Sequence, residues 1–282
     1  MLVDKPAGPT SHDVVARVRR VFGIRAVGHA GTLDPFATGL LVLVLGAATR
    51  LARFVEAEPK TYFATARLGV RTATDDLTGA VIESVHPAEW PPRAAVAREL
   101  GVLAGTQLQR PPVYSAKLVG GQRSYRLARK GADVALESVE ITVHGIELTD
   151  YQPPLVSFRA TVSSGTYLRA LGRDLGVALG VGGHLTVLRR EAIGRFHVEQ
   201  AVPLDRLDAG ATLLPPESLV AGLPWVPLRD DEAVAVSHGR AVVREGVTEG
   251  EAALLAAGRL VAVARAVPGG WHPSVVLPAG AP

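Results

Sequence analysis

The chain has 282 residues, of which 48% are hydrophobic and 20% are charged, and its formal net charge is +3. This length predicts one large domain with a small one, or one extended mixed domain, and the composition is too apolar for a disordered chain. The sequence has no cysteine, which excludes disulfides, thiolate metal sites and cysteine nucleophiles. The longest apolar run, residues 40–48, is far shorter than the roughly 20 residues that span a bilayer. The N-terminal MLVDKPAG lacks the pattern of a secretory signal, so we expect a cytoplasmic protein without a membrane span.

The first part of the chain alternates between helical and strand patterns. Apolar residues at helical spacing follow Ser11, which predicts a helix with Ser11 as its N-cap. The patterns that follow predict a buried strand over 39–46, a short helix over 49–57, a strand over 61–68 and a helix over 87–104.

The second part of the chain predicts two long strands, a helix and a separate C-terminal module. The strands cover 138–146 and 155–163 around a Pro153-Pro154 turn, and the helix covers 167–179. Four prolines within 214–227 place a domain boundary near Gly222. Short strand patterns at 259–267 and 274–277 indicate a small β-rich module over 223–282.

Positive charge is concentrated in one internal segment. Residues 100–132 contain no acidic side chain, and Tyr114 and Tyr125 lie among their basic residues. These basic residues are Arg110, Lys117, Arg123, Arg126, Arg129 and Lys130. Such a segment is typical of a surface that follows RNA phosphates and stacks on bases, but charge alone is equally compatible with a solvated helix face.

The most distinctive segment is GHAGTLDPFATGLL, residues 28–41, in which the single carboxylate Asp34 lies among apolar neighbours. An aspartate before a proline is also common at helix caps and turns, so the residues alone leave both interpretations open. The eight histidines form no HxH or HExxH pattern, and we predict no metal site.

Six segments, in the same order over residues 1 to about 195, resemble the bacterial tRNA pseudouridine-55 synthases of the TruB type. They read DKPAGPTSHDVV, HAGTLDPFATGLLVLVLGAATR, TYFATARLG, RPPVYSAKLVGGQRSYRLARKG, SGTYLRALGRDLG and HLTVLRR. The resemblance implies an α+β fold: a catalytic domain, residues 1–222, around a curved, mainly antiparallel sheet flanked by helices, with a basic RNA-gripping insertion at about 105–132. A small β-rich PUA-like domain, residues 223–282, would follow. The implied reaction converts uridine 55 in the T loop of tRNA to pseudouridine by base flipping, without cofactor or metal.

The resemblance also implies roles for single residues. Asp34 matches the catalytic aspartate, and His29 the histidine that enters the T loop. The other matching positions are the base-stacking Tyr62, the pocket residues Tyr167 and Arg169, and the pocket leucine Leu188. The ordinary alternatives are a turn histidine, core packing for the tyrosines and the leucine, and a phosphate-binding or surface arginine.

The basic segment supplies the expected RNA-backbone contacts, Lys117, Arg123, Arg126 and Lys130. On a predicted helix over 122–130, Arg123, Arg126 and Lys130 would share a face. Two departures from the family pattern are visible. The chain starts almost inside its first motif, so we expect a clipped first strand, and Ser163 and Ser164 replace a cysteine and a basic residue common in relatives.

The chemistry is consistent with a single carboxylate. Pseudouridine formation breaks the bond between N1 and C1′ and joins C5 to C1′, so no atom enters or leaves, whereas glycosidases generally need a second carboxylate. Asp34 could add to C1′, add to C6 or take a proton from C2′, and each route needs its ionised form. An adjacent Arg169 would favour that form despite burial.

Three other functions stay open: a tRNA-folding chaperone, a guide-RNA-dependent pseudouridine synthase and a nucleoside-hydrolysing glycosidase. The intact Asp34 motif argues against binding alone, the basic segment against guide dependence, and the lack of a second motif carboxylate against hydrolysis. We expect a monomer that binds the T arm, and through the PUA-like domain the acceptor stem, of tRNA without an obligate protein partner.

Overall fold

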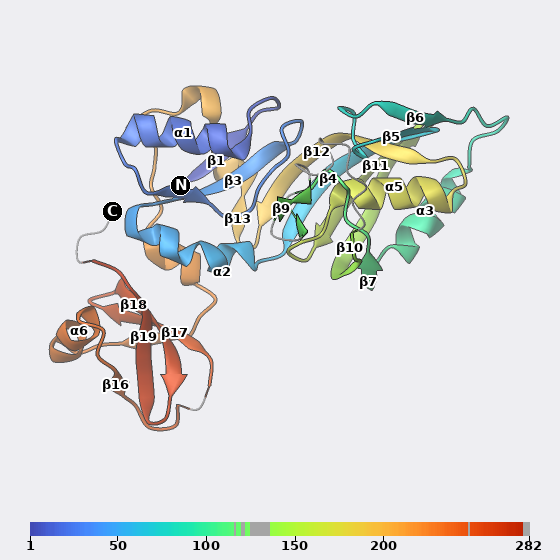
Figure 1. Ribbon diagram of the computed structural model, residues 1–282. Helices are drawn as coiled ribbons and strands as arrows, with labels where there is room; N and C mark the ends of the chain where they lie inside the picture. Colours follow the sequence, from blue (N-terminus) through green and yellow to red (C-terminus); the bar gives the residue numbers. More distant parts are fainter. Residues whose placement is uncertain (116, 120–121, 125–135, 248, 279–282) are drawn as a thin grey trace.

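The computed structural model describes residues 1–115, 117–119, 122–124, 136–247 and 249–278, with only the backbone at 118–119 and 122–123. Within these residues a large mixed sheet forms the body of the molecule, and a five-stranded sheet near the C-terminus lies to one side of it (Figure 1). The strand order in the large sheet is β14-β1-β3-β12-β4-β11-β10-β7, with β2 paired to β3 and β13 paired to β12.

The large sheet contains β1 (Leu2–Lys5), β2 (Val27–His29), β3 (Thr38–Leu45), β4 (Lys60–Leu68), β7 (Gly105–Gln109), β10 (Val139–Gln152), β11 (Leu155–Val162), β12 (Gly183–Ile193), β13 (Phe196–His197) and β14 (Val202–Pro203). Two hairpins stand apart, formed by β5 (Val70–Thr72) with β6 (Val81–Ser84) and by β8 (Leu118–Val119) with β9 (Gln122–Arg123). The small sheet contains β15 (Trp225–Pro227), β16 (Val242–Val243), β17 (Glu251–Ala256), β18 (Arg259–Val267) and β19 (Gly270–Val276). The α-helices within the described residues are α1 (Ser11–Phe22), α2 (Ala52–Glu56), α3 (Arg93–Val102), α5 (Leu168–Ala178) and α6 (Asp230–Ser237).

These elements confirm the predicted α+β class with a mainly antiparallel sheet. Within the described part of the large sheet, the parallel pairs are β1 with β14 and β3 with β12. The strand β1 has four residues and is paired on both sides, to β14 and to β3. The strands expected around Pro153-Pro154 form the antiparallel pair β10–β11, although β10 extends six residues beyond its predicted end, from 146 to 152.

Two predicted helices differ in their bounds. The helix expected over 87–104 begins only at Arg93, because Pro91 and Pro92 precede it and Pro92 occupies the N-cap in an extended conformation. The helix expected over 49–57 is a 3-10 turn, η1 (Gly46–Leu51), followed by the one-turn helix α2.

The N-cap of α1 is Thr10, not Ser11 as predicted. The Thr10 hydroxyl accepts a hydrogen bond from the Asp13 backbone N–H at 3.1 Å, and the Asp13 carboxylate accepts one from the Thr10 N–H at 2.8 Å. This reciprocal capping box satisfies two donors at the start of the helix. Ser11 is therefore free for a tertiary contact, and its hydroxyl accepts a hydrogen bond from the Leu33 N–H at 2.9 Å and donates one to the Leu33 carbonyl at 3.2 Å.

A buried lysine holds the other side of the same loop. Lys5 is 0% exposed, and its ammonium donates to the carbonyls of Pro6, Pro9 and Pro35 at 2.9, 2.9 and 3.3 Å. Burial lowers the pKa of Lys5 to about 8, so the ammonium stays mostly charged at neutral pH. Ser11 and Lys5 thus fix the residues on both sides of Asp34.

The parallel contact between β3 and β12 depends on a glycine. Gly39 has a φ of 102°, and a Cβ at this position would collide with the backbone of Arg190 on β12. The absence of a side chain lets the two strands approach, with Arg190 in register with Gly39. This junction joins the half of the sheet that carries residue 34 to the half that carries β4 and β12.

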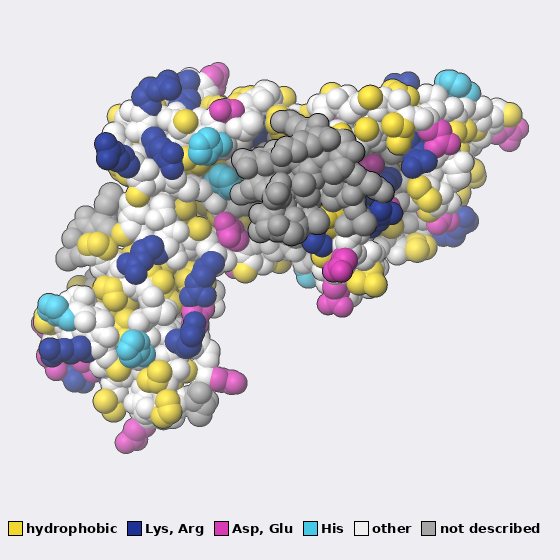
Figure 2. Space-filling view, in the orientation of Figure 1, with side chains coloured by type: hydrophobic (Ala, Val, Ile, Leu, Met, Phe, Trp, Pro, Cys, Tyr) yellow, Lys and Arg dark blue, Asp and Glu magenta, His cyan; other side chains and the backbone are white. Residues whose placement is uncertain are grey.

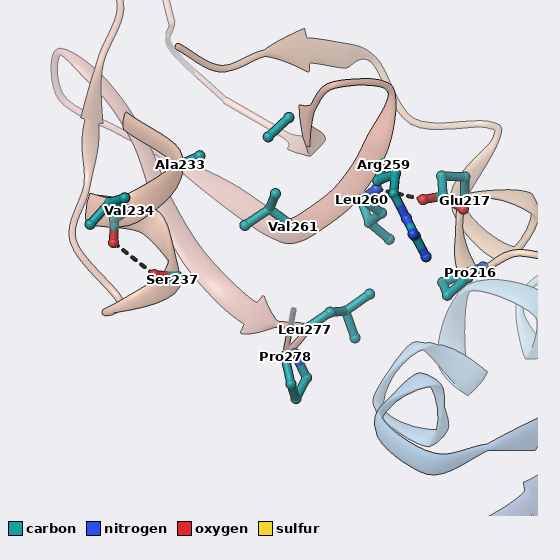
Figure 3. Close-up of a pocket in the computed structure, with 11 residues that line it drawn as sticks. Pro216, Glu217, Ala233, Val234, Ser237, Arg259, Leu260, Val261, Leu277 and Pro278 are labelled. Carbon is teal, nitrogen blue, oxygen red and sulfur yellow. Dashed lines mark hydrogen bonds between the residues drawn. The ribbon is translucent and has the colours of Figure 1, made fainter. Parts of the chain in front are cut away.

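The C-terminal sheet shares an apolar cluster with the main body. Leu51 of η1, Val220 of η4 (Pro216–Val220) and Leu255, Leu260 and Val263 of β17 and β18 are buried against one another. At the edge of this junction, a cavity of about 370 Å³ lies among Leu260, Val261, Leu277, Pro216 and α6 (Figure 3). No helix in the described ranges is both long and apolar enough to cross a membrane.

We predict that Lys5→Met lowers the free energy of unfolding by about 3 kcal/mol, because it leaves three carbonyls without their donor and removes a satisfied cation. Urea denaturation followed by circular dichroism measures this change. Arg98→Met is the control, since the Arg98 side chain is 70% exposed and, among the described residues, pairs only with its neighbour Glu99. It should change stability by less than about 0.5 kcal/mol. Equal effects of the two substitutions would contradict a structural role for Lys5.

Candidate active site

A cavity of about 320 Å³ opens between the loop after β2, strands β4 and β12, and the N-terminus of α5. Its volume is at the low end of the range for small-molecule sites, about 300–1,000 Å³. The cavity is lined by Gly31, Thr32, Leu33, Asp34, Glu56, Lys60, Tyr62, Ser164, Gly165, Thr166, Tyr167, Leu168, Arg169, Leu188 and Arg190. Five of the six residues for which the sequence predicts a place at the catalytic site are among them.

The centre of the cavity wall is an ion pair between Asp34 and Arg169. Arg169 Nε lies 2.9 Å from Asp34 Oδ2, and Nη2 donates to Asp34 Oδ1 at 3.3 Å. The Arg169 side chain is 6% exposed, whereas that of Asp34 is 35% exposed. The guanidinium is thus fixed behind the carboxylate, and the carboxylate is left accessible from the cavity.

Arg169 is held by three further partners. Its guanidinium donates to the carbonyls of Thr74 and Tyr114, each at 2.9 Å, and Nη1 lies 3.4 Å from Asp76 Oδ2. Asp76 is 4% exposed, and its other oxygen accepts hydrogen bonds from the Thr74 hydroxyl and from both the N–H and the hydroxyl of Thr78. Asp76 was not predicted as a site residue, because an acidic residue in the segment TDDLTG is indistinguishable from an ordinary turn residue.

The two influences expected on Asp34 oppose each other as predicted, but burial is the larger. Burial raises the pKa of the Asp34 carboxyl above its usual value of 3.8. Arg169 and, more weakly, Lys5 lower this pKa, while the nearby Asp76 raises it. The ionised form is therefore maintained by Arg169 against an unfavourable environment.

Tyr62 and Leu188 line the cavity from adjacent strands. Each is 7% exposed; Tyr62 lies on β4 opposite Arg190, and Leu188 lies on β12. Both also belong to the main apolar cluster, so cavity lining and core packing coincide as the sequence analysis allowed. Tyr167 is the N-cap residue of α5, and both its N–H and its carbonyl are hydrogen-bonded to the side chain of Gln109.

His29 is not among the residues that line the cavity. It lies on the short strand β2, half-buried, and its Nδ1 has no hydrogen-bond partner among the described residues. Burial, reinforced by the charge of Arg190, lowers the pKa of His29, so its neutral form is favoured. The neutral form of His29 thus carries a buried ring nitrogen, Nδ1, that has no hydrogen-bond partner among the described residues.

Two buried cations, Arg190 and Lys60, also line the cavity and were not predicted as site residues. Arg190 lies in the motif HLTVLRR, and Lys60 directly precedes the motif TYFATARLG. Arg190 is 1% exposed and donates to the carbonyls of Leu40, Thr32 and Gly31 at 2.8, 3.3 and 2.9 Å. Lys60 is 6% exposed and donates to two carbonyls in the segment before β4. Burial lowers the pKa of Lys60 to about 8, and the charge of Arg190 contributes.

Most of the predicted RNA-backbone residues lie outside the residues that the structure describes. Lys117 is described, and its ammonium donates to the Glu137 carbonyl at 3.0 Å. Arg126 and Lys130 lie outside the described residues, as does the side chain of Arg123. The backbone of Gln122–Arg123 forms a strand paired with Leu118–Val119, so the predicted helix does not begin at Gln122 and Arg123 is not on it.

The two serines that depart from the family pattern occupy different places. The Ser163 hydroxyl accepts a hydrogen bond from the Thr142 N–H at 2.9 Å and so joins β10 to the loop before α5. Ser164 is exposed and lines the cavity. The loss of a basic residue here leaves a small hydroxyl side chain at the cavity wall.

The cavity beside the C-terminal sheet is a weaker candidate for chemistry. Its walls are mainly aliphatic, and the carboxylate of Glu217 already accepts a hydrogen bond from the Leu260 N–H (Figure 3). In the described part of the chain, no cluster of three or more His, Asp or Glu side chains is placed to hold a metal ion. The Asp34 cavity therefore combines an accessible carboxylate with a fixed cation, which the other cavity does not offer.

Comparisons with known proteins point in one direction. The model of the TruB family pseudouridylate synthase (N terminal domain) matches residues 19–168, and that of the tRNA pseudouridylate synthase B C-terminal domain matches residues 169–219. The tRNA pseudouridine synthase B of Thermobifida fusca is 47% identical over 98% of this chain and 97% of its own length. That of Mycobacterium tuberculosis is 45% identical over 94% and 91%.

Solved structures share the fold over most of the chain. An H/ACA RNP bound to a substrate RNA containing 2′-deoxyuridine has a chain that matches with a TM-score of 0.74 and 25% identity, covering 99% of this chain and 84% of its own length. A Cbf5-Nop10-Gar1 complex has a chain that matches with a TM-score of 0.72 and 28% identity, covering 93% of this chain and 76% of its own length.

We predict that Arg169→Gln raises the pKa of Asp34 further, because it removes the cation that stabilises the carboxylate. Asp76→Asn should lower the pKa of Asp34, since the charge of Asp76 disfavours ionisation of Asp34. Carbon-13 NMR of aspartate-labelled protein, titrated with acid, measures both shifts. An Asp34 pKa that stays constant in both variants would show that the neighbouring charges do not control it.

Proposed function

The chain belongs to the TruB family of pseudouridylate synthases and is a tRNA pseudouridine synthase, and we propose that it acts on uridine 55 in the T loop with Asp34 as its catalytic carboxylate. The observation that carries this proposal is the ion pair of Asp34 with Arg169 at 2.9 Å, in which the carboxylate is accessible and the guanidinium is not. A reactive carboxylate must be reached by the substrate, while its orientation must be fixed in advance.

The proposed reaction requires a base that has left its stack. A nucleotide in a paired or stacked loop hides its reacting atoms, so the enzyme must flip it into the cavity. Tyr62 offers an aromatic face and Leu188 an aliphatic wall for the uracil ring, and stacking of this kind is worth about 1–3 kcal/mol per base. His29, next to the cavity, would occupy the space that the flipped base leaves.

The ionised form of Asp34 is the reactive one in each of the routes open to it. It can add to C1′, add to C6 or accept the proton of C2′. Arg169 keeps the carboxylate charged and oriented while the uracil ring rotates. Because uracil leaves as a delocalised anion and is recaptured by the same ribose, the cavity must retain it. The nearby positive charges of Arg169, Lys60 and Arg190 favour an anion in this space.

A glycosidase remains the relevant chemical alternative, because a second carboxylate reaches the cavity. Glu56 is exposed at the rim and forms no ion pair with a described residue. Its position outside the ion-paired centre supports isomerisation over hydrolysis, and the products separate the two: hydrolysis releases free uracil and leaves an abasic ribose, whereas isomerisation releases nothing.

The proposed partner surface is positively charged. Basic side chains gather over α1 and along the junction with the C-terminal module on one face of the molecule (Figure 2). Arg17, Arg19 and Arg20 of α1 are exposed, and such a surface attracts phosphates with little regard to sequence. We propose that the T arm lies along this face and that residues 223–282, as a PUA-like domain, contact the acceptor stem. We also propose that the protein acts in the cytoplasm as a monomer without a guide RNA.

We predict that Asp34→Asn abolishes pseudouridine formation on an unmodified tRNA transcript, while the affinity for tRNA changes by less than about threefold. The substitution keeps the shape and removes the charge, so only the chemical step should fail. Mapping of pseudouridine at nucleotide resolution and a filter-binding assay provide the two measurements.

Glu56→Gln is the matched comparison, since it removes the other carboxylate of the cavity, and it should retain most of the turnover. Turnover by a homogeneous Asp34→Asn protein would exclude Asp34 as the catalytic group. Tight binding by the wild type without any pseudouridine would favour the chaperone, and released uracil would favour the glycosidase.

A further inference from the structure

Helix α5 presents two arginines on one face. Arg169 and Arg173 are four residues apart, which places their side chains next to each other along the helix. Arg169 is the partner of Asp34, whereas nothing so far assigns a role to Arg173.

Arg173 has three partners of its own. Its Nη1 donates to Asp75 Oδ2 at 3.0 Å, its Nη2 to the Arg110 carbonyl at 2.9 Å, and its Nε to Asp174 at 2.9 Å. The Arg173 and Asp75 side chains are 18% and 17% exposed, so this pair is mostly shielded from water. Such a pair is less screened than a surface ion pair and restricts geometry more strongly.

The two arginines make equivalent contacts. Each reaches one carboxylate of the adjacent pair Asp75 and Asp76, and each donates to a backbone carbonyl of the 110–114 segment. The carbonyl acceptors are those of Arg110 and Tyr114. Arg169 and Arg173 therefore each join the loop after β5 and the segment after β7 to α5. Of the two, Arg169 is the arginine that also contacts Asp34.

The backbone at Asp75 adopts an uncommon conformation that its contacts hold in place. Asp75 has a φ of 58°, in the left-handed region that non-glycine residues rarely adopt. Its carbonyl accepts a hydrogen bond from the Leu185 N–H of β12 at 3.0 Å, and its carboxylate is held by Arg173. These contacts hold the backbone at Asp75, and through it the position of Asp76, the next residue.

We propose that Asp75 and Arg173 are positioning residues, which hold Asp76 and the Tyr114 carbonyl against Arg169 so that its guanidinium stays aligned with both oxygens of Asp34. The pair touches no substrate atom and acts only through Arg169. The inference rests on the proposed function, because its effect is on the reaction in which Asp34 is the catalytic carboxylate.

The consequence for Asp34 has a definite sign, because the charge of Arg169 lowers its pKa more than the charge of Asp76 raises it. The charged groups that face Asp34 are Arg169 from α5, Asp76 from the loop after β5, and Lys5 from β1. If Arg169 is less well aligned, the carboxylate loses part of the interaction that lowers its pKa. The pH at which the reaction rate falls on the acid side should then move upward.

The experiment uses full-length protein with Asp75→Asn or Arg173→Gln. Asparagine tolerates the left-handed conformation, so Asp75→Asn removes the charge and leaves the loop able to form. Single-turnover rates on saturating unmodified tRNA are measured from pH 5 to 8. We expect the rate at pH 7 to fall on the order of tenfold, less than the roughly 100-fold that a 1 Å misplacement can cost, with unchanged tRNA affinity and an acid limb displaced to higher pH.

Glu83→Gln is the matched control. It removes the ion pair between Glu83 and Arg71 on the same β5–β6 hairpin, whose two side chains are 48% and 42% exposed respectively. Because this pair lies in solvent, its loss should change neither the rate nor the acid limb of the pH profile. The double variant Asp75→Asn with Arg173→Gln should lose little more of the rate than either single variant, because both substitutions break the same ion pair.

Thermal melting of each variant separates folding from positioning. Wild-type rates and pH dependence in folded Asp75→Asn and Arg173→Gln would overturn the inference. So would a loss of rate, in proportion to unfolded protein, with the acid limb in its original place. A wild-type protein without turnover would instead contradict the proposed function, and if Arg173→Gln does not fold, Asp75→Asn decides.

Discussion

The buried guanidinium of Arg169 organises the site, because a cation that is 5% exposed must find partners for its donors inside the protein. Those partners come from three separate parts of the chain: Asp34 after β2, Thr74 and Asp76 after β5, and the Tyr114 carbonyl. Satisfying one cation therefore brings distant segments together. The position and the charge of the proposed catalytic carboxylate follow from the same requirement, and this links the stability of the fold to its chemistry.

The remaining buried cations around the cavity are satisfied in a different way. Lys5, Lys60 and Arg190 donate to backbone carbonyls, and within the described residues they form no ion pair with a carboxylate. Their hydrogen bonds are complete while their charges are not cancelled, so the cavity keeps a positive potential. A substrate that develops negative charge on its leaving base benefits from this arrangement.

The sequence predicts more of this site than of the contacts that support it. Asp34 and Arg169 lie in extended motifs, and the family resemblance predicts both as site residues, while the structure shows that they are in contact. Asp76, in contrast, is recognisable only once the loop after β5 has folded against α5, because no local pattern marks a turn aspartate as the partner of a distant arginine. The same limit applies to Thr10 and Ser11: both residues suit an N-cap, and the tertiary bond between Ser11 and Leu33 decides between them. The strand β12 was not predicted because HLTVLRR mixes two arginines with its apolar residues, which obscures a strand pattern.

The apolar cluster shared by η1, η4 and the C-terminal sheet has a consequence for how a long RNA is recognised. Leu51 and Val220 are buried in it, and Arg53 and Arg50 add contacts to Glu251 and to the Val276 carbonyl across the junction. Contacts of this kind restrict bending between the two parts, so they constrain the interval between the Asp34 cavity and the C-terminal module. An RNA that touches both would have to match that interval, and inserting or deleting a base pair between the two contacts would leave one of them empty.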